Sequence, residues 1–220
     1  MFTGIVKEIG TVKSVNRKTD LVQLAIDCPG IRQNIVEGDS IAIDGCDLTA
    51  TKLTPSGFEC DATLETLKVT TLGDLRTGAH VNLEPALTPQ TSISGHFVLG
   101  HIDGIGTVRE MKRRGEQAEI IIDVPRELMK FIARKGSITI AGVGLTVVSI
   151  GNTADNSFSC WIIPYTLEHT TLGGHQGRPG AKINIEVDVI ARHVVRALES
   201  GIQTSNEGIT EEFLHEHGFG

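Results

Sequence analysis

The sequence predicts an all-β protein with two similar six-stranded antiparallel barrels of Greek-key type in tandem, followed by a C-terminal α-helix. Three observations predict this fold. Short segments rich in valine, isoleucine and threonine recur between glycine, aspartate and proline residues, which is typical of strands. These segments do not alternate regularly with helical patterns, which disfavours a parallel sheet. The strand pattern also occurs twice in 220 residues, so we expect two copies of one module.

The duplication is visible as ordered matches between the two halves. Ile9-Gly10-Thr11-Val12 matches Ile105-Gly106-Thr107-Val108, at a separation of 96 residues. Phe58–Gly73 matches Phe158–Gly173 at 8 of 16 positions, at a separation of 100. The separation grows slowly along the chain, as expected when loops gain single residues while strands keep their length. The stretch Ser94–Gly106 therefore reads as the joint between two repeats.

Each half contains six predicted strands with short helical segments between them. In the first half the strands are Gly4–Val15, Leu21–Asp27, Ser40–Ile43, Leu48–Leu53, Gly57–Ala62 and His80–Leu83. Pro125–Arg134 predicts a short helix, because proline suits a first turn and its apolar residues share one face. Pro29–Val36 is its counterpart in the first repeat. Glu65–Leu72 and Thr166–Leu172 each predict a turn of helix.

The repeat assigns residues 1–95 to a first barrel and 96–187 to a second. Two further segments follow the second barrel and belong to neither repeat. Asp188–Ser200 predicts the one strong helix, with Asp188 as its N-cap. Its apolar stripe consists of Ile190, Val194, Val195 and Leu198. The stripe predicts packing either on a partner subunit or on a barrel of its own chain. Residues 201–220 read as a polar tail.

Composition excludes several classes of function. The net charge is −7, with 27 acidic against 20 basic residues, so binding to nucleic acid is disfavoured. The first residues lack a secretory signal pattern, and the most apolar window, Ile138–Ile150, is too short and interrupted to span a membrane. The four cysteines show no CxxC spacing. These observations predict a cytoplasmic protein with reduced thiols.

Local motifs do not identify a metal or nucleotide site. The sequence has no HxxxH, HExxH or paired-cysteine spacing, and it lacks a Walker loop and a GxGxxG motif. His96 and His101, in GHFVLGHIDG, are five residues apart, so a regular strand would point them to opposite faces. On pattern alone they are either a polar joint between barrels or catalytic groups.

Longer runs of sequence carry a resemblance to a known family. They are MFTGIV at Met1–Val6, IDGCDLT at Ile43–Thr49, ETLKVTTLGDL at Glu65–Leu75, VNLE at Val81–Glu84, GHFVLGHIDG at Gly95–Gly104, KGSITIAGVGLTV at Lys135–Val147, IIPYTLEHTTLG at Ile162–Gly173 and NIEVD at Asn184–Asp188. Together these runs resemble the riboflavin synthase family, with its duplicated lumazine-binding barrel. The resemblance extends from Met1 to about Ser200.

The resemblance implies a transferase that moves a four-carbon unit between two molecules of 6,7-dimethyl-8-ribityllumazine. The products are riboflavin and 5-amino-6-(D-ribitylamino)uracil, in the last step of riboflavin biosynthesis, with no metal or redox cofactor. It also implies a homotrimer with its active site between the N-terminal barrel of one subunit and the C-terminal barrel of the next. Lumazine synthase is a further partner that it suggests. Two similar pockets suit two identical substrates, because positioning both can supply roughly 7–11 kcal/mol of the barrier.

The resemblance also implies the residues of the two pockets. In the first barrel it implies Phe2, Thr3, Gly4, Ile5, Val6, Ser40, Leu48, Thr49, Ala62, Thr63 and Thr66. In the second barrel it implies Gly100, His101, Ile102, Lys135, Leu145, Thr146, Ile163, Pro164, Tyr165, Thr166, Leu167 and Glu168. His101 is the best candidate for proton transfer, with His96 in support. Without the resemblance, these glycines and threonines read as bulge and strand residues.

Two positions depart from the family pattern. Asp47 stands where the family usually has cysteine, and Gly144 stands at the equivalent position of the second repeat, where serine is usual. Cys46 is adjacent, but neighbouring strand residues face opposite ways, so it should not substitute for the missing thiol. Asp47 can act as a base. Two hypotheses follow: an active riboflavin synthase, or a non-catalytic lumazine- or flavin-binding relative.

Overall fold

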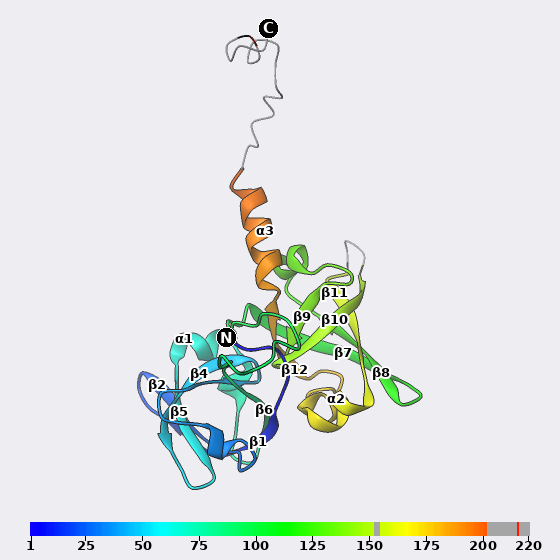
Figure 1. Ribbon diagram of the computed structural model, residues 1–220. Coiled ribbons are helices and arrows are strands. Elements are labelled where there is room, and N and C mark those ends of the chain that lie inside the picture. The colour runs from blue at the N-terminus through cyan, green and yellow to red at the C-terminus, as the bar shows by residue number, and fades with distance from the viewer. Residues whose placement is uncertain (152–154, 202–214, 216–220) are drawn as a thin grey trace.

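The computed structural model describes residues 1–151, 155–201 and 215, and forms two closed six-stranded barrels. In the first barrel the strands are β1 Glu8–Arg17, β2 Leu21–Asp27, β3 Ser40–Ile43, β4 Cys46–Leu53, β5 Gly57–Thr63 and β6 His80–Pro85. In the second they are β7 Gly104–Arg114, β8 Gln117–Asp123, β9 Ser137–Ile140, β10 Val143–Ile150, β11 Ser157–Ile162 and β12 Lys182–Val187. The two barrels lie side by side (Figure 1), which confirms the predicted fold.

Both barrels have the same topology. The first closes in the order β1-β2-β5-β4-β3-β6, and the second in the equivalent order β7-β8-β11-β10-β9-β12, with every pairing antiparallel. Apolar side chains fill the interior of each barrel, because every second residue of a strand points inward. Leu24 and Ile26 on β2 are buried in the first core, and Ile120 and Ile122 on β8 are buried in the second.

Short helices connect the strands where turns of helix were predicted. They are α1 Leu64–Val69, α2 Pro164–His169 and the 3-10 helices η1 Arg32–Asn34, η2 Thr71–Asp74, η3 Arg126–Phe131 and η4 Thr171–Gly173. The first strand begins at Glu8 rather than at Gly4, because the chain before it leaves its own sheet. The residues before Glu8 contribute to the candidate site described below.

The barrels meet through a reciprocal set of contacts. Gly45 and Gly142 approach so closely that a Cβ on Gly45 would lie 2.8 Å from the Gly142 nitrogen. The Asn82 amide donates to the Ala141 carbonyl (2.8 Å) and accepts from the Thr171 N–H (2.8 Å). Asn184 is the equivalent residue of the second barrel. Its amide donates to the Asp44 carbonyl and accepts from the Thr71 N–H, both of the first barrel. Because buried polar groups are paired on both sides, the two barrels are held in one arrangement.

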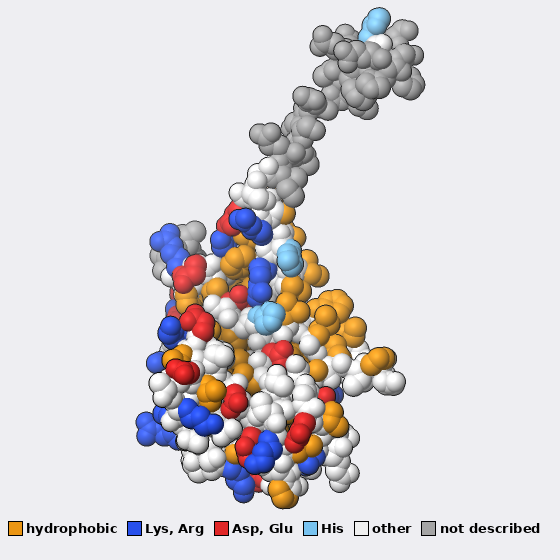
Figure 2. Space-filling model, turned by 90° about the vertical axis from the view of Figure 1, so that its left-hand side faces the viewer, with side chains coloured by type: hydrophobic (Ala, Val, Ile, Leu, Met, Phe, Trp, Pro, Cys, Tyr) orange, Lys and Arg blue, Asp and Glu red, His pale blue; other side chains and the backbone are white. Residues whose placement is uncertain are grey.

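The predicted C-terminal helix is present as α3, Val189–Glu199, and Asp188 caps it by accepting from the Ile190 N–H (2.8 Å). Arg192 donates to Asp103 (2.8 Å), which ties the start of the helix to the second barrel. The apolar stripe is not covered: Ile190, Val194 and Leu198 are 62%, 52% and 76% exposed. The helix rises from the second barrel beside η3 (Figure 1), where Lys130 pairs with Glu199, and apolar side chains gather along its flank (Figure 2).

In the part of the chain that the structure describes, no helix has the length and apolar character needed to cross a membrane. Most of the predicted polar tail, 201–220, lies outside the described residues.

Candidate ligand-binding walls

The chain just before β1 and the chain just before β7 cross each other at the barrel interface. We call them the two leading segments. Phe2 and Val98 form an antiparallel bridge, with N–H···O distances of 2.7 and 3.1 Å. The Glu84 carboxylate accepts from the backbone N–H groups of Thr3 (2.7 Å) and Gly4 (3.0 Å). This arrangement fixes the first segment by burying a carboxylate whose oxygens are satisfied by backbone donors.

The second segment is held in the same way. Glu186 accepts from the N–H groups of Leu99 (2.8 Å) and Gly100 (3.0 Å). Burial raises the pKa of Glu186 to about 7, against the lowering effect of these hydrogen bonds. Burial also raises the pKa of Glu84. Both carboxylates come from the VNLE and NIEVD runs, whose anchoring role was not predicted from the sequence.

The crossing reverses one expectation. Gly4–Val6 was expected in the first barrel's pocket, but the Gly4 carbonyl accepts from the Gly144 N–H (2.8 Å) of β10, and Val6 packs on the second core. Likewise Gly100–Ile102 lies against the first barrel, where the Gly100 carbonyl accepts from the Asp47 N–H (3.0 Å) and Ile102 packs on the first core. Each segment is anchored by its own barrel and then reaches the other.

Both glycines are required by this crossing. Gly4 and Gly100 have φ of 78° and 82°, a left-handed conformation that glycine adopts without strain. A Cβ on Gly4 would lie 2.7 Å from the Gly144 nitrogen, and one on Gly100 would lie 2.5 Å from the Asp47 Cβ. They are therefore close-approach glycines, and not merely bulge residues.

The outward faces of β3, β4 and β5, with the start of α1, form what we call the first wall: Ser40, Asp47, Thr49, Thr63 and Thr66. Ser40 pairs with Thr49 across β3 and β4, so their hydroxyls share one face. Thr63 caps α1 by accepting from the Thr66 N–H (3.2 Å). Asp47 Oδ1 is buried and has no hydrogen-bond partner within the described residues. The wall thus presents hydroxyls beside the half-buried carboxylate of Asp47.

The equivalent face of the second barrel, the second wall, is more apolar: Gly144, Thr146, Ile163 and Tyr165, while Leu145 between them packs on the second core. Ile163 and Tyr165 are 54% and 66% exposed. His96 lies here, with Nε2 3.2 Å from the Thr139 hydroxyl, and a Cβ on Gly144 would meet its ring at 3.2 Å. Burial lowers the pKa of His96, and the Asp188 charge partly opposes this.

The two histidines are therefore on different barrels. His96 lies on the second wall, while His101 is exposed and follows Gly100 at the edge of the first wall. Within one chain His96 borders the second wall and His101 the first, and the support of His101 by His96 stays a prediction. Asp47, Thr49 and Ser40 accompany His101 instead.

Several expected residues can offer a ligand only their backbone. Phe2, Leu48, Ala62 and Leu167 are buried, and all but Phe2 belong to the two barrel cores. Pro164 and Thr166 are half-buried in the first turn of α2, while Glu168, Lys135 and Ile5 are exposed. Thr3 is buried because its hydroxyl donates to Glu84.

Cys46 does not replace the missing thiol, as predicted. Its side chain faces the first core, and burial, with the charges of Asp47, Glu186 and Asp44, raises its pKa to about 12. The four cysteines are free and buried. Among the described residues, no three histidine, cysteine, aspartate or glutamate side chains are grouped so as to hold a metal ion.

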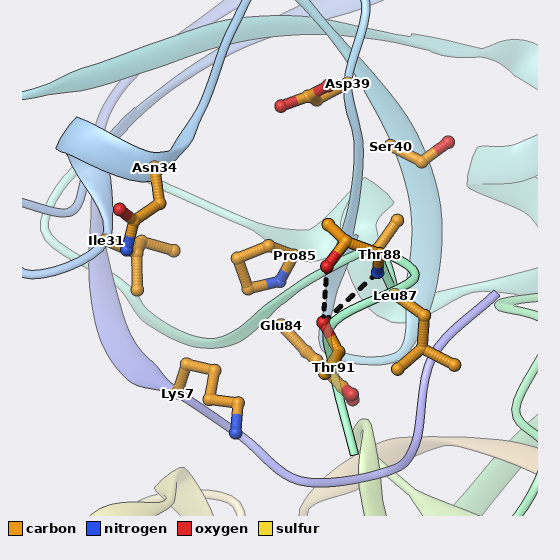
Figure 3. Close-up of a pocket in the computed structure, with 11 residues that line it drawn as sticks. Lys7, Ile31, Asn34, Asp39, Ser40, Glu84, Pro85, Leu87, Thr88 and Thr91 are labelled. Atoms are coloured by element: carbon orange, nitrogen blue, oxygen red, sulfur yellow. Dashed lines mark hydrogen bonds between the residues drawn. The ribbon is translucent and has the colours of Figure 1, made fainter. Parts of the chain in front are cut away.

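A cavity of about 580 Å³ opens beside the first wall, between the end of β6, the loop before β3 and residues 85–91 (Figure 3). Of the expected site residues it contains Ser40. Lys7, Asn34 and Asp39 contribute polar groups, and the Thr91 hydroxyl accepts from the Thr88 N–H (3.1 Å). The cavity extends the polar surface of the first wall.

Comparison with known proteins places this geometry in a family. The lumazine binding domain model matches twice, at residues 3–86 and 99–188. Riboflavin synthase of Photobacterium phosphoreum is 36% identical over 221 residues, covering 100% of this chain and 99% of that protein. Riboflavin synthase of Bacillus subtilis (strain 168) is 35% identical over 220 residues, covering both chains completely. The chain belongs to the riboflavin synthase family.

Solved structures agree with this family membership. The crystal structure of LumP complexed with riboflavin has a TM-score of 0.76 at 26% identity, and covers 85% of this chain and 99% of LumP. LumP complexed with 6,7-dimethyl-8-(1'-D-ribityl) lumazine has the same TM-score and coverage at 23% identity, which shows the shared fold. Duplicated barrels of this kind thus hold such ligands in a protein of the same architecture.

Sequence reasoning missed two wall residues. Ala50 pairs with Cys60 between β4 and β5, and the same antiparallel register, continued by one residue, brings Asp61 opposite Thr49 on the first wall. Asp61 Oδ1, like that of Asp47, is buried without a hydrogen-bond partner in the described residues. Trp161 is its equivalent on the second wall and is 38% exposed. The 100-residue separation between the repeats, combined with strand alternation, could have identified both.

Proposed function

We propose that this protein is a riboflavin synthase, which transfers a four-carbon unit from one 6,7-dimethyl-8-ribityllumazine to another and releases riboflavin and 5-amino-6-(D-ribitylamino)uracil. The observation that carries the proposal is the full-length similarity to riboflavin synthases, combined with two equivalent walls on two equivalent barrels. A reaction between two identical substrates needs two similar binding faces held in register.

On the first wall, we assign hydroxyl contacts to Ser40 and Thr49, and proton transfer to His101 and Asp47. The 7-methyl group of the lumazine is acidic, so a nearby base can remove its proton. A carboxylate oxygen without a partner is a suitable acceptor, and Asp47 Oδ1 is in that state within the described residues. Asp47 thus takes over a position where the family usually carries a thiol.

On the second wall, we assign ring contacts to the apolar surface of Ile163 and Tyr165, with the hydroxyl of Thr146 beside them. The backbone of Gly4–Val6 borders this wall, because Gly4 pairs with Gly144. His96 is half-buried beside Gly144. With its pKa lowered, it is neutral near pH 7 and can accept or donate a proton without carrying a permanent charge.

Two bound lumazines must meet, and we propose that they do so between subunits of a homotrimer. The uncovered stripe of α3 supports this assembly, because an exposed apolar helix face is a common association surface. The first wall of one subunit then faces the second wall of its neighbour. Cytoplasmic location remains a prediction from the sequence, and a complex with lumazine synthase remains a prediction from the family resemblance.

Asp47 and Gly144 favour the alternative of a binding protein without turnover, because both family side chains are absent. The similarity to enzymes over the whole chain favours catalysis. Incubating the purified protein with 6,7-dimethyl-8-ribityllumazine and following riboflavin by absorbance decides between them. Riboflavin formation is expected, whereas tight binding of the lumazine with no riboflavin would establish the binding protein.

A further inference from the structure

A second cleft lies between the two barrels, away from both walls. It has a volume of about 490 Å³ and is lined by the segment from η2 to the start of β6 on one side and by the turn before β12 on the other. None of the residues assigned to the walls lines it. Its volume is in the range of small-molecule sites.

Cationic side chains gather around this cleft in a chain of net charge −7. Arg76 comes from the first barrel, and His175 and Lys182 come from the second. Among the described residues, neither Arg76 nor Lys182 has an ion-pair partner. The lining also holds two carboxyls, the exposed Asp74 and the buried Asp44, but burial raises the pKa of Asp44 to about 7, so positive charge exceeds negative charge.

His175 is the third basic residue of the lining. Burial lowers the pKa of its imidazole, and the nearby His80 and Arg178 lower it further. The fixed positive charges of the lining are therefore Arg76 from the first barrel and Lys182 from the second. Such a concentration of positive potential attracts anions.

The inner end of the cleft has an unsatisfied hydroxyl. Thr71 is 8% exposed, and its Oγ1 has no hydrogen-bond partner within the described residues. The nearby Asp44 carboxyl adds no free acceptor there, because it already accepts from the Asn82 N–H (2.8 Å) and the Gln176 amide (2.9 Å). A buried hydroxyl of this kind calls for a partner.

We propose that this cleft binds a phosphate monoester, whose oxyanion contacts Arg76, His175 and Lys182 and whose apolar body lies against Leu75, Ala79 and Ala181. Arginine and lysine are the side chains that best recognise phosphate. Because both barrels contribute, the ligand binds the assembled pair of barrels and stabilises the folded state. This site is independent of the proposed function.

Phenyl phosphate and phenol are a suitable probe pair, since they differ by the phosphate alone. Isothermal titration of the full chain should show saturable binding of phenyl phosphate and none of phenol, with inorganic phosphate binding more weakly. The melting temperature should rise with phenyl phosphate concentration. The R76Q/K182Q variant should lose at least about tenfold in affinity, because two charge-assisted contacts are removed.

The matched control is K18Q/R114Q, which removes the same charge from exposed hairpin residues outside the cleft. This variant should bind as the wild type does. H175Q provides a separate test if circular dichroism shows that R76Q/K182Q is misfolded, and it should also weaken binding. The proposal is overturned if the wild type shows no saturable binding, if both double variants bind alike, or if 6,7-dimethyl-8-ribityllumazine displaces the probe.

Discussion

At the scale of single residues, Asp47 combines a backbone role with a side-chain role. Its backbone N–H holds the crossing segment through Gly100, while its carboxylate oxygen faces the first wall without a partner in the described residues. The backbone role would survive substitution, but the side-chain role would not. Substitutions at position 47 therefore separate chemistry from architecture.

Asp47→Asn should lower kcat by about a hundredfold or more, because removal of a general base typically has effects of that size. Asp47→Cys should match or exceed the wild-type rate, since the family usually carries a thiol there. Glu59→Gln, on the outer face of β5 where Glu59 pairs with Lys52, is the control and should change little. Equal rates for all three variants, measured as riboflavin formed, would make position 47 a bystander.

Asp44 predicts an unusual pH dependence of stability. Burial raises the pKa of this carboxyl from 3.8 to about 7, outweighing its hydrogen bonds to Asn82 and Gln176. The folded state therefore keeps the proton after the unfolded state has lost it, so this group costs stability as pH rises from about 4 to about 7.

The prediction is that Asp44→Asn, which does not titrate, loses less stability than the wild type between pH 4 and pH 7. Glu186 titrates in the same range and is present in both proteins, so the difference between the two isolates Asp44. Urea unfolding at several pH values measures it. Parallel stability curves for the two proteins would show that Asp44 has an ordinary pKa.

At the scale of elements, the crossing of the two leading segments organises both walls. Strand positions, the short helices and the capped α3 could be predicted, because alternation and capping are local properties of the sequence. The crossing could not, because Gly4 and Gly100 are equivalent in their repeats. Whether each segment stays with its own barrel or reaches the other is decided by packing between barrels.

Gly100→Ala should destabilise the fold more than Gly78→Ala. Both glycines have positive φ, at 82° and 87°, so both substitutions carry similar backbone strain. At Gly78 no atom lies within 4 Å of an added Cβ, whereas at Gly100 it would meet Asp47 at 2.5 Å. The excess should be about 1–3 kcal/mol, the usual cost of overpacking. Equal losses in denaturant unfolding would show that the segment does not cross tightly against β4.

At the scale of the whole molecule, duplication gives two walls of common plan and different chemistry. Asp47 and Asp61 on the first wall correspond to Gly144 and Trp161 on the second, so one wall is acidic and the other apolar. The duplication could be read from the sequence, but the separation of His96 from His101 could not, since it follows from the crossing. Walls on different barrels of one chain make assembly essential to the proposed chemistry.

V194E/L198E should convert the proposed homotrimer to monomers, because charges on the uncovered stripe of α3 prevent its burial. Turnover should fall with trimer content, while binding of the lumazine to each wall is retained. Val36→Glu, at an exposed apolar residue outside α3, is the control and should remain trimeric. A monomeric variant with full activity in sedimentation and rate measurements would contradict catalysis between subunits.

The stoichiometry of the reaction tests the central claim most directly. With 6,7-dimethyl-8-ribityllumazine as the sole substrate, the amounts of lumazine, riboflavin and 5-amino-6-(D-ribitylamino)uracil are measured by chromatography over time. Each riboflavin should appear with one molecule of the uracil as two lumazines disappear. Lumazine that is bound but not consumed, or consumed without an equal yield of the two products, would contradict it.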